Sequence, residues 1–172
     1  KEVVRGEKRV ILKVVVESDG KNEAIDFGKA EPSKLSRNEV IEKMIQSGTW
    51  AMLRQRPYST IAKVQDKPKC IVVSMFDTAP MAPDNNFIIA NQMEAVKAGA
   101  EALAKLTDGQ VYLNVNSEET KKALEALKFS AKNISVNVFQ GPHPAGNVST
   151  QLNVLSPINK GEIVWYCYAQ NI

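Results

Sequence analysis

The sequence has few of the residues from which metal and iron–sulfur sites are built. Its 172 residues include two cysteines and one histidine. Cys70 and Cys167 lie in separate apolar runs and no C-x-x-C pair occurs, so neither a zinc site nor an iron–sulfur cluster formed by this chain alone is expected. A metal site that used the single histidine would need carboxylates for every other ligand. We therefore predict no metal site.

The glycine-rich motifs that bind nucleotide phosphates are missing as well. No G-x-G-x-x-G follows a strand-like run, and no G-x-x-x-x-G-K-[ST] occurs. Such glycines let backbone N–H groups approach a phosphate closely. A flavin or nicotinamide site of the usual form is therefore not expected. The hydrolase motif G-x-S-x-G and the metalloprotease motif H-E-x-x-H are also absent.

Charge and hydrophobicity argue against two further classes of partner. The net charge is +3, from 22 Lys and Arg against 19 Asp and Glu, and the two signs are interleaved along the chain. This pattern predicts no nucleic-acid binding. No apolar run approaches the roughly 20 residues of a membrane-spanning helix, so no transmembrane segment is predicted.

What the sequence does contain is an alternation of strand-like and helix-like segments. Strands are predicted over residues 9–16 and over "CIVVSMFD", "QVYLNV", "NISVNVF" and "EIVWYCY". Helices are predicted from Ser36 to Gly48, over residues 86–106 and over "EETKKALEALK", with capping serines at 36 and 117. The segment "QGPHPAGNVST" is predicted to be irregular. The alternation predicts an α/β domain of three layers, with helices on both faces of a largely parallel sheet.

Ligands of parallel sheets bind beyond the carboxyl ends of the strands, and two residues stand out there. Asp77 follows "CIVVSMF" and either offers a carboxylate to a ligand or forms a turn by accepting N–H groups ahead of it. His143 lies between two prolines. It either presents a ring that can exchange protons near neutral pH or only shapes the loop.

The least usual stretch is "GTWAMLRQRPYST", residues 48–60. Trp50 and Tyr58 have flat rings, Arg54 and Arg56 have planar donors, and Pro57 stiffens the chain. One interpretation is a surface that binds a flat, oxygen-bearing ligand or a partner protein. The other is that Trp50 and Leu53 belong to the core and the arginines pair with surface acids.

Several stretches together resemble the A subunits of the sodium-translocating NADH:quinone reductases. They follow the order and rough spacing of that family over essentially the whole chain. These stretches are "VVRGEKRVILKVVV", "SGTWAMLRQRPYS", "SMFDTAPMAPD", "EAVKAGAEALAKLTDGQVY" and "GPHPAG". One departure follows "GPHPAG": the family usually continues with Gly-Thr-His-x-His, whereas this chain has Gln151 and Asn153 at the two histidine positions. Proton delivery by those imidazoles is therefore not expected.

The resemblance implies a fold similar to the flavin-binding domain of the NADH-oxidising subunit of complex I. In that relative the segment after the first helix is glycine-rich and wraps the flavin phosphate. Here "GTWAMLRQRP" stands in its place with one glycine, and bulky side chains block the backbone approach that a phosphate needs. We therefore expect a domain that has lost its flavin site, with no FMN and no Fe–S cluster. Retained flavin binding is the weaker alternative.

The resemblance also implies a function. The family consists of peripheral subunits on the cytoplasmic face of the bacterial inner membrane, in a complex that couples electron transport from NADH to quinone with sodium transport. Ubiquinone or menaquinone binding is associated with the Arg-x-Arg-Pro stretch, which carries over to Trp50, Met52, Leu53, Arg54, Arg56, Pro57 and Tyr58. Quinone rings stack on aromatic side chains, and quinone oxygens accept hydrogen bonds from arginine.

The expected partners are the other subunits of the complex and quinone, and the fragment alone is expected to be inactive. Residues 1–30 are expected to be the last strand and linker of a barrel-like β domain, and residues 31–172 a Rossmann-like α/β domain. Because the chain starts at Lys1 inside a strand-like run, we expect a piece of a longer protein. The alternative function is a non-catalytic scaffold whose Trp/Arg loop docks onto the membrane subunits.

Overall fold

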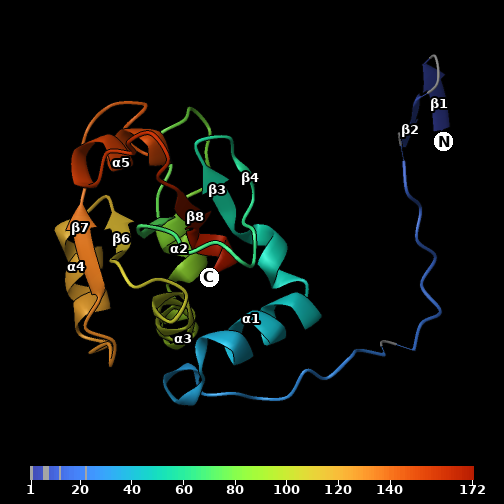
Figure 1. Cartoon of the computed structure of the whole chain (residues 1–172), viewed down its shortest axis with the longest axis horizontal. Coiled ribbons are helices and arrows are strands. Elements are labelled where there is room, and N and C mark those ends of the chain that lie inside the picture. Colours follow the sequence, from blue (N-terminus) through green and yellow to red (C-terminus); the bar gives the residue numbers. More distant parts are fainter. Residues whose placement is uncertain (1, 6–7, 12, 22) are drawn as a thin grey trace.

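The computed structural model describes residues 2–5, 8–11, 13–21 and 23–172. At its start, strands β1 (Glu2–Arg5) and β2 (Lys8–Ile11) form an antiparallel hairpin. Residues 13–21 and 23–31, which follow the hairpin, contain no helix or strand (Figure 1). The strand predicted over residues 9–16 is therefore too long. Residue 12 lies outside the described residues, and Val14, Val15 and Val16 are 75–85% exposed because no described strand pairs with them.

Residues 32–172 are built on one six-stranded sheet with the strand order β4-β3-β8-β5-β6-β7. Its strands are β3 (Arg54–Arg56), β4 (Thr60–Ile61), β5 (Ile71–Ser74), β6 (Val111–Val115), β7 (Ile134–Val138) and β8 (Val164–Tyr168). Strands β5 to β8 run parallel, whereas β3 is antiparallel to both β8 and β4. The sheet is therefore mixed: the four predicted strands pair in parallel, and the hairpin β3–β4 is an addition that the sequence patterns did not predict.

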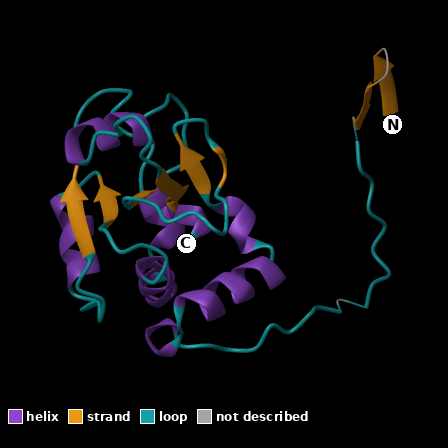
Figure 2. Cartoon of the chain, in the orientation of Figure 1, coloured by secondary structure: helices purple, strands orange, loops and turns teal. Residues whose placement is uncertain are grey.

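Helices cover both faces of this sheet, as predicted (Figure 2). The helices are η1 (Pro32–Lys34), α1 (Arg37–Gln46), η2 (Thr49–Met52), α2 (Asn85–Ile89), α3 (Met93–Ala104), α4 (Glu118–Glu125), α5 (Val148–Leu155) and η3 (Ala169–Asn171). Apolar residues of α1, α3 and α4 share one core cluster with Ile71 and Val73 of β5. Residues of α5 share a second cluster with Val72 of β5 on the opposite face.

Strand β5 lies between these two clusters and is completely buried. Its four residues, Ile71–Ser74, are each 0% exposed. A run of consecutive apolar residues is typical of such a strand, because both of its faces are covered by helices. The predictions for β5, β6, β7 and β8 are confirmed.

The predicted helix starts are confirmed in atomic detail. Ser36 accepts a hydrogen bond from the backbone of Glu39, and the Glu39 carboxylate accepts one from the backbone of Ser36. Ser117 accepts a hydrogen bond from the backbone of Thr120 at the start of α4. Gly48 has a φ of 78°, the left-handed conformation in which glycine commonly follows a helix.

Two helix predictions are wrong. The helix predicted over residues 86–106 is broken into α2 and α3, with a turn between them at residues 90–92. The segment predicted to be irregular after Gly146 contains α5. Val148, Ser149 and Thr150 have poor helix propensity, but Val148 and Leu152 are one turn apart and both pack on the sheet.

Candidate functional site

The stretch at residues 48–60 forms the short helix η2 followed by the hairpin β3–β4. Trp50 and Leu53 are 7% and 1% exposed and belong to the main core cluster. The indole N–H of Trp50 donates to the backbone oxygen of Ala62 at 2.8 Å, which satisfies its one donor. For these two residues the core interpretation is therefore confirmed.

Strand β3 sends its alternate side chains to opposite faces of the sheet. Gln55 pairs with Trp165 in the register, and its side-chain oxygen accepts from the Trp165 indole at 3.0 Å on the face covered by α1 and α3. Arg54 and Arg56 pair with Tyr166 and Val164, which pack on the α5 side. Since directly paired residues share a face, both arginines project toward the α5 side.

The guanidinium of Arg56 is held by hydroxyl groups rather than by acids. It donates to Oγ of Ser59 at 2.9 Å and also to Oγ of Ser149 at the start of α5. Tyr166 donates to the same Ser59 oxygen at 3.2 Å. The structure therefore shows hydroxyl partners for Arg56, in place of the acidic partners that the core interpretation expects.

Tyr168 lies beside this group. Its ring meets the Tyr166 ring edge to face, with centroids 5.9 Å apart. Burial, followed by the neighbouring Tyr166 and Asp77, raises the pKa of Tyr168, and the charge of Arg56 partly opposes the shift. At neutral pH this phenol is therefore a hydrogen-bond donor. Tyr58 and Pro57, in contrast, are exposed at the hairpin turn, with Tyr58 86% exposed.

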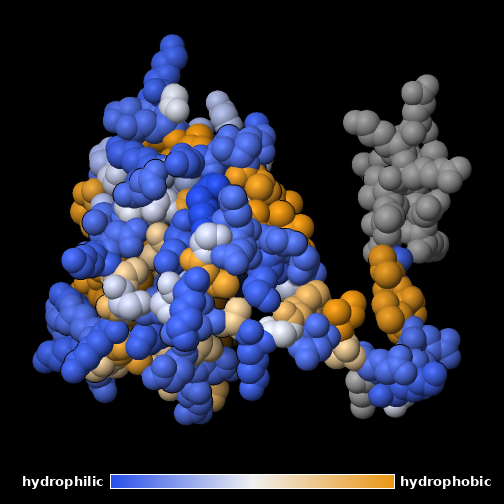
Figure 3. Space-filling view, turned by 60° about the horizontal axis from the view of Figure 1, so that its bottom comes forward, coloured by the Kyte–Doolittle hydropathy of each residue, from blue (hydrophilic) through white to orange (hydrophobic). Residues whose placement is uncertain are grey.

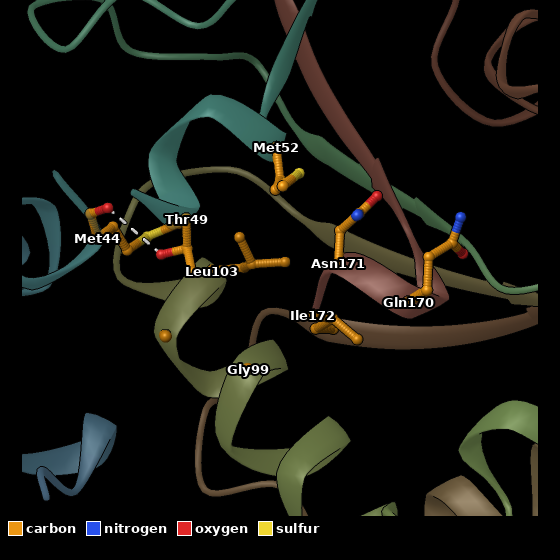
Figure 4. A pocket seen from close by; sticks show the side chains of 9 residues that line it. Met44, Thr49, Met52, Gly99, Leu103, Gln170, Asn171 and Ile172 are labelled. Atoms are coloured by element: carbon orange, nitrogen blue, oxygen red, sulfur yellow. Dashed lines mark hydrogen bonds between the residues drawn. The ribbon is translucent and has the colours of Figure 1, made fainter. Parts of the chain in front are cut away.

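An apolar groove opens on the other side of the sheet, next to η2. It has a volume of about 400 Å³. Its apolar lining comes from α1, η2, α3 and the last residue: Met44, Met52, Gly99, Ala102, Leu103 and Ile172. Thr49, Gln170 and Asn171 add polar groups at its border, and Figure 4 shows the Gln170 and Asn171 amides beside Ile172.

The residues predicted to bind quinone therefore do not form one surface. Met52 lies in the groove with Trp50 and Leu53 in the core behind it, whereas Arg54 and Arg56 project toward the opposite face of the sheet. A ligand in the groove cannot contact these guanidinium groups, because β3 and β8 stand between them.

The sequence interpretation missed Met44, Leu103 and the 170–172 segment. The helical spacing around Leu103 predicts only that it is a core residue. No motif of neighbouring residues indicates that residue 172 lies next to residue 52 in the fold.

The two residues predicted at the strand ends do lie together. The Asp77 carboxylate accepts from the backbone N–H of Ala79 at 2.8 Å, which is the predicted turn. Nδ1 of His143 lies 3.2 Å from the hydroxyl of Thr78. That hydroxyl also accepts the backbone N–H of Gly146 at 3.0 Å. In this structure Thr78 therefore joins the loop of Asp77 to the loop of His143; a ligand role for Asp77 and His143 remains a prediction.

Beneath these loops a chain of buried polar side chains links three strands to α5. Gln151 is 0% exposed, accepts from the Asn114 amide at 3.0 Å and donates to the Ser74 hydroxyl at 2.9 Å. Asn137 donates to Asn114 at 3.1 Å. Each of these links joins residues far apart in sequence, so no local motif indicates the network. Gln151 occupies one of the two positions at which the family resemblance leads one to expect histidine.

Metal-binding and membrane-spanning features are not found in the part of the chain that the structure describes. No three side chains of His, Cys, Asp or Glu are grouped as metal ligands among these described residues. None of the described helices has both the length and the apolar character needed to cross a bilayer.

Fold and site together define an α/β domain with helices on both faces of its sheet and an apolar groove beside η2. Comparison with known proteins gives the particular family. Residues 35–172 match the family model described as the NqrA second alpha/beta domain, and the chain belongs to this family. The family expected from the sequence motifs is thereby confirmed.

Three of the curated relatives share one name, which describes each as the A subunit of a Na(+)-translocating NADH-quinone reductase. Those from Vibrio anguillarum and Vibrio parahaemolyticus are 37% and 36% identical over 174 residues, or 99% of this chain. The relative from Yersinia pseudotuberculosis is 34% identical over 171 residues, or 98% of this chain. In each case the chain spans 37% of the length of the relative.

Proposed function

We propose that this chain serves in a Na+-translocating NADH:quinone reductase, on the cytoplasmic face of the membrane, and that its apolar groove contributes to binding ubiquinone or menaquinone. The relatives are named as subunits of such an enzyme, but the chain spans only 37% of their length. Electron transfer from NADH and sodium transport are therefore proposed for the whole complex. The chain by itself is proposed to be inactive.

The groove beside Met52 is the observation that supports quinone binding. Its volume of about 400 Å³ falls within the range of small-molecule sites. A lining of methionine, leucine and isoleucine suits an isoprenoid chain, and thioethers adapt to irregular apolar shapes. The amides of Gln170 and Asn171 provide N–H donors for quinone carbonyl oxygens. We therefore propose Met52 as the quinone contact in this stretch, in preference to Arg54 and Arg56.

The test compares two variants of the complete subunit in the purified complex. Met52→Asp introduces a carboxylate into the apolar groove, so we expect the KM for a short-chain quinone to rise at least about tenfold, equivalent to about 1.4 kcal/mol. Arg54→Ala, on the opposite face, is the matched control and leaves the KM unchanged. A raised KM in Arg54→Ala together with an unchanged KM in Met52→Asp would instead support the arginine site inferred from the sequence.

We also propose that this chain binds no flavin and no iron–sulfur cluster. The support is steric: Trp50 fills the position after the first helix, where its ring contacts Trp165 and its N–H is bonded to Ala62. An isoalloxazine absorbance band in the purified protein would contradict this proposal.

A scaffold role is the second candidate function. It is favoured by Arg54 and Tyr58, which are exposed on the β3–β4 hairpin away from the groove. Substitution of both by alanine is then expected to release the protein from the complex without changing its affinity for quinone.

A further inference from the structure

A tight turn with a fully exposed apolar tip lies between β5 and α2. The backbone N–H of Ala82 donates to the oxygen of Ala79 at 3.1 Å, which closes a β-turn over residues 79–82. Pro80 at the second position fixes a negative φ, and Met81 at the third has a φ of 65°. This combination is a type II turn, whose third position normally takes glycine or asparagine.

Methionine is a poor residue for that position, and nothing in the described chain compensates for it. The left-handed region is unfavourable for such a side chain, because its Cβ crowds the following carbonyl oxygen. Met81 is 100% exposed, so its thioether packs against no other described residue. A large apolar side chain held on a strained backbone in solvent suggests a role outside the domain itself.

The helix after the turn carries further exposed apolar side chains. Figure 3 shows one face of the molecule, on which apolar residues lie among hydrophilic ones at the surface. In α2, Phe87 is 84% exposed and Ile88 is 42% exposed, whereas Asn85 and Ile89 are buried and attach the helix to the domain. We refer to Met81, Phe87 and Ile88 as the apolar tip. Methionine and aromatic residues are enriched in protein–protein interfaces relative to the rest of the surface.

The base of the apolar tip is held from several sides. Asp77 closes one turn by accepting from Ala79, and Asp84 accepts from the backbone of Asn86 at 2.9 Å at the start of α2. A Cβ added to Gly146 would lie 2.7 Å from the backbone nitrogen of Thr78, so the neighbouring loop packs directly against this one. Such preorganisation lowers the entropy that is lost on binding.

The side chain of Asn86 fixes the helix end of the tip. It donates to Oδ1 of Asn116 at 3.2 Å and accepts from the hydroxyl of Thr120 at 3.0 Å. The tip is therefore presented by a framework in which side-chain hydrogen bonds connect α2 to the start of α4.

Charge around the apolar tip favours one kind of partner. Residues 76–96 contain Asp77, Asp84 and Glu94, and no Lys or Arg. Glu119 lines the hollow that also contains Asn86. These carboxylates would repel anionic lipid headgroups. They would be attracted to a protein pocket whose rim carries basic side chains.

We propose that the apolar tip inserts into an apolar, basic-rimmed pocket on another subunit of the complex. The inference rests on the proposed function, because it requires assembly with other subunits. It assigns that contact to residues 79–88, outside the β3–β4 hairpin. Of these residues, Ile88 also lines a small hollow with Gln170 and Ile172 at the border of the groove.

The test separates anchoring from folding by replacing Met81 in the complete subunit. Met81→Gly and Met81→Asn both remove the thioether, and both residues tolerate a positive φ. We expect the melting temperature to stay within a few degrees of wild type while the affinity for the remaining subunits falls about tenfold or more. The matched control is Val154→Ala, which also removes apolar atoms from an exposed position, on α5, and leaves the affinity unchanged.

A photo-crosslinking residue at position 81 of the assembled complex identifies what covers the tip. An adduct with a different subunit, absent when the same residue is placed at position 154, supports the proposal. An adduct within the same chain, or none, or a Met81→Gly protein that assembles with wild-type affinity, overturns it. Binding of the wild-type protein to vesicles of anionic lipid, lost in Met81→Gly, would show that the tip contacts a membrane instead. If the wild-type protein is not recovered in the complex at all, the proposed function fails rather than this inference alone.

Discussion

The rings of Trp50 and Trp165 meet edge to face, with their centroids 5.4 Å apart and their planes at 84°. This contact joins η2 to the second residue of β8, and both indole N–H groups have partners, Ala62 and Gln55 respectively. Edge-to-face contact suits the charge distribution of two aromatic rings. The aromatic residue that looks most like a ligand contact in the sequence therefore belongs to the structural core.

Trp50→Ala is expected to destabilise the domain strongly. The substitution leaves a cavity against Trp165 and an unpaired backbone oxygen at Ala62, so the free energy of unfolding should fall by about 3–5 kcal/mol. Urea unfolding followed by circular dichroism measures the change. Tyr58→Ala is the control, because Tyr58 is 86% exposed and its removal should cost less than about 0.5 kcal/mol. Equal losses in the two variants would contradict this assignment of Trp50 to the core.

Features of the fold that depend on neighbouring residues could be predicted from the sequence. The Ser36 and Ser117 caps and the buried strand β5 are examples, because a capping bond or an apolar run is complete within a few residues. The two-residue strand β4 offers no such pattern, and β3 reads "RQR", which contains no apolar residue. Strand β3 forms because β8, about 110 positions further along the chain, supplies its partner, and β4 then pairs with β3.

The candidate site was predictable only in part, for the same reason. The motif around residue 52 includes a residue that lines the groove, but the register with β8 decides which face each side chain joins. That register sends Arg54 and Arg56 toward α5, away from Met52. The groove also needs Leu103 and Ile172, which are brought to Met52 by the fold alone.

Gln151→Leu is expected to destabilise the domain although the change in volume is small. The variant leaves the buried Asn114 amide without its acceptor and the Ser74 hydroxyl without one donor. An unsatisfied buried polar group costs about 1–3 kcal/mol, so chemical denaturation should show a loss in this range. Asn153→Leu, an exposed position on the same helix, is the control with no expected loss. A Gln151→Leu protein as stable as wild type would show that the network contributes little to stability.

Gly146→Ala tests the close contact between the two strand-end loops. The new methyl group would lie 2.7 Å from the Thr78 nitrogen and 3.0 Å from the Asp77 Cα, and both are backbone atoms that cannot rotate away. Overpacking of this kind costs about 1–3 kcal/mol. The matched control is Asn147→Ala at the next residue, whose side chain makes no capping bond. The prediction is wrong if thermal unfolding shows the same midpoint for both variants.

The two cysteines are expected to be inert in the folded protein and to make it less stable at high pH. Burial raises the pKa of Cys70, and burial raises the pKa of Cys167 from 9.0 to about 12. Since the thiolate is the reactive form, neither residue should react with a thiol reagent at pH 8 until the protein is unfolded by denaturant. Labelling of either cysteine in the native protein would contradict this.

The pH dependence follows from the sign of the Cys167 shift. The folded protein keeps the thiol proton above pH 9, whereas the unfolded chain releases it, so the unfolded state binds fewer protons. The stabilising contribution is therefore fully present below pH 9 and is lost as the pH rises toward 12. Urea unfolding of wild type and Cys167→Ala between pH 8 and about pH 10.5 isolates this effect, because the other titrating groups are common to both proteins. We expect the wild-type free energy of unfolding to fall more steeply with pH than that of the variant, and parallel curves would show that the thiol does not contribute.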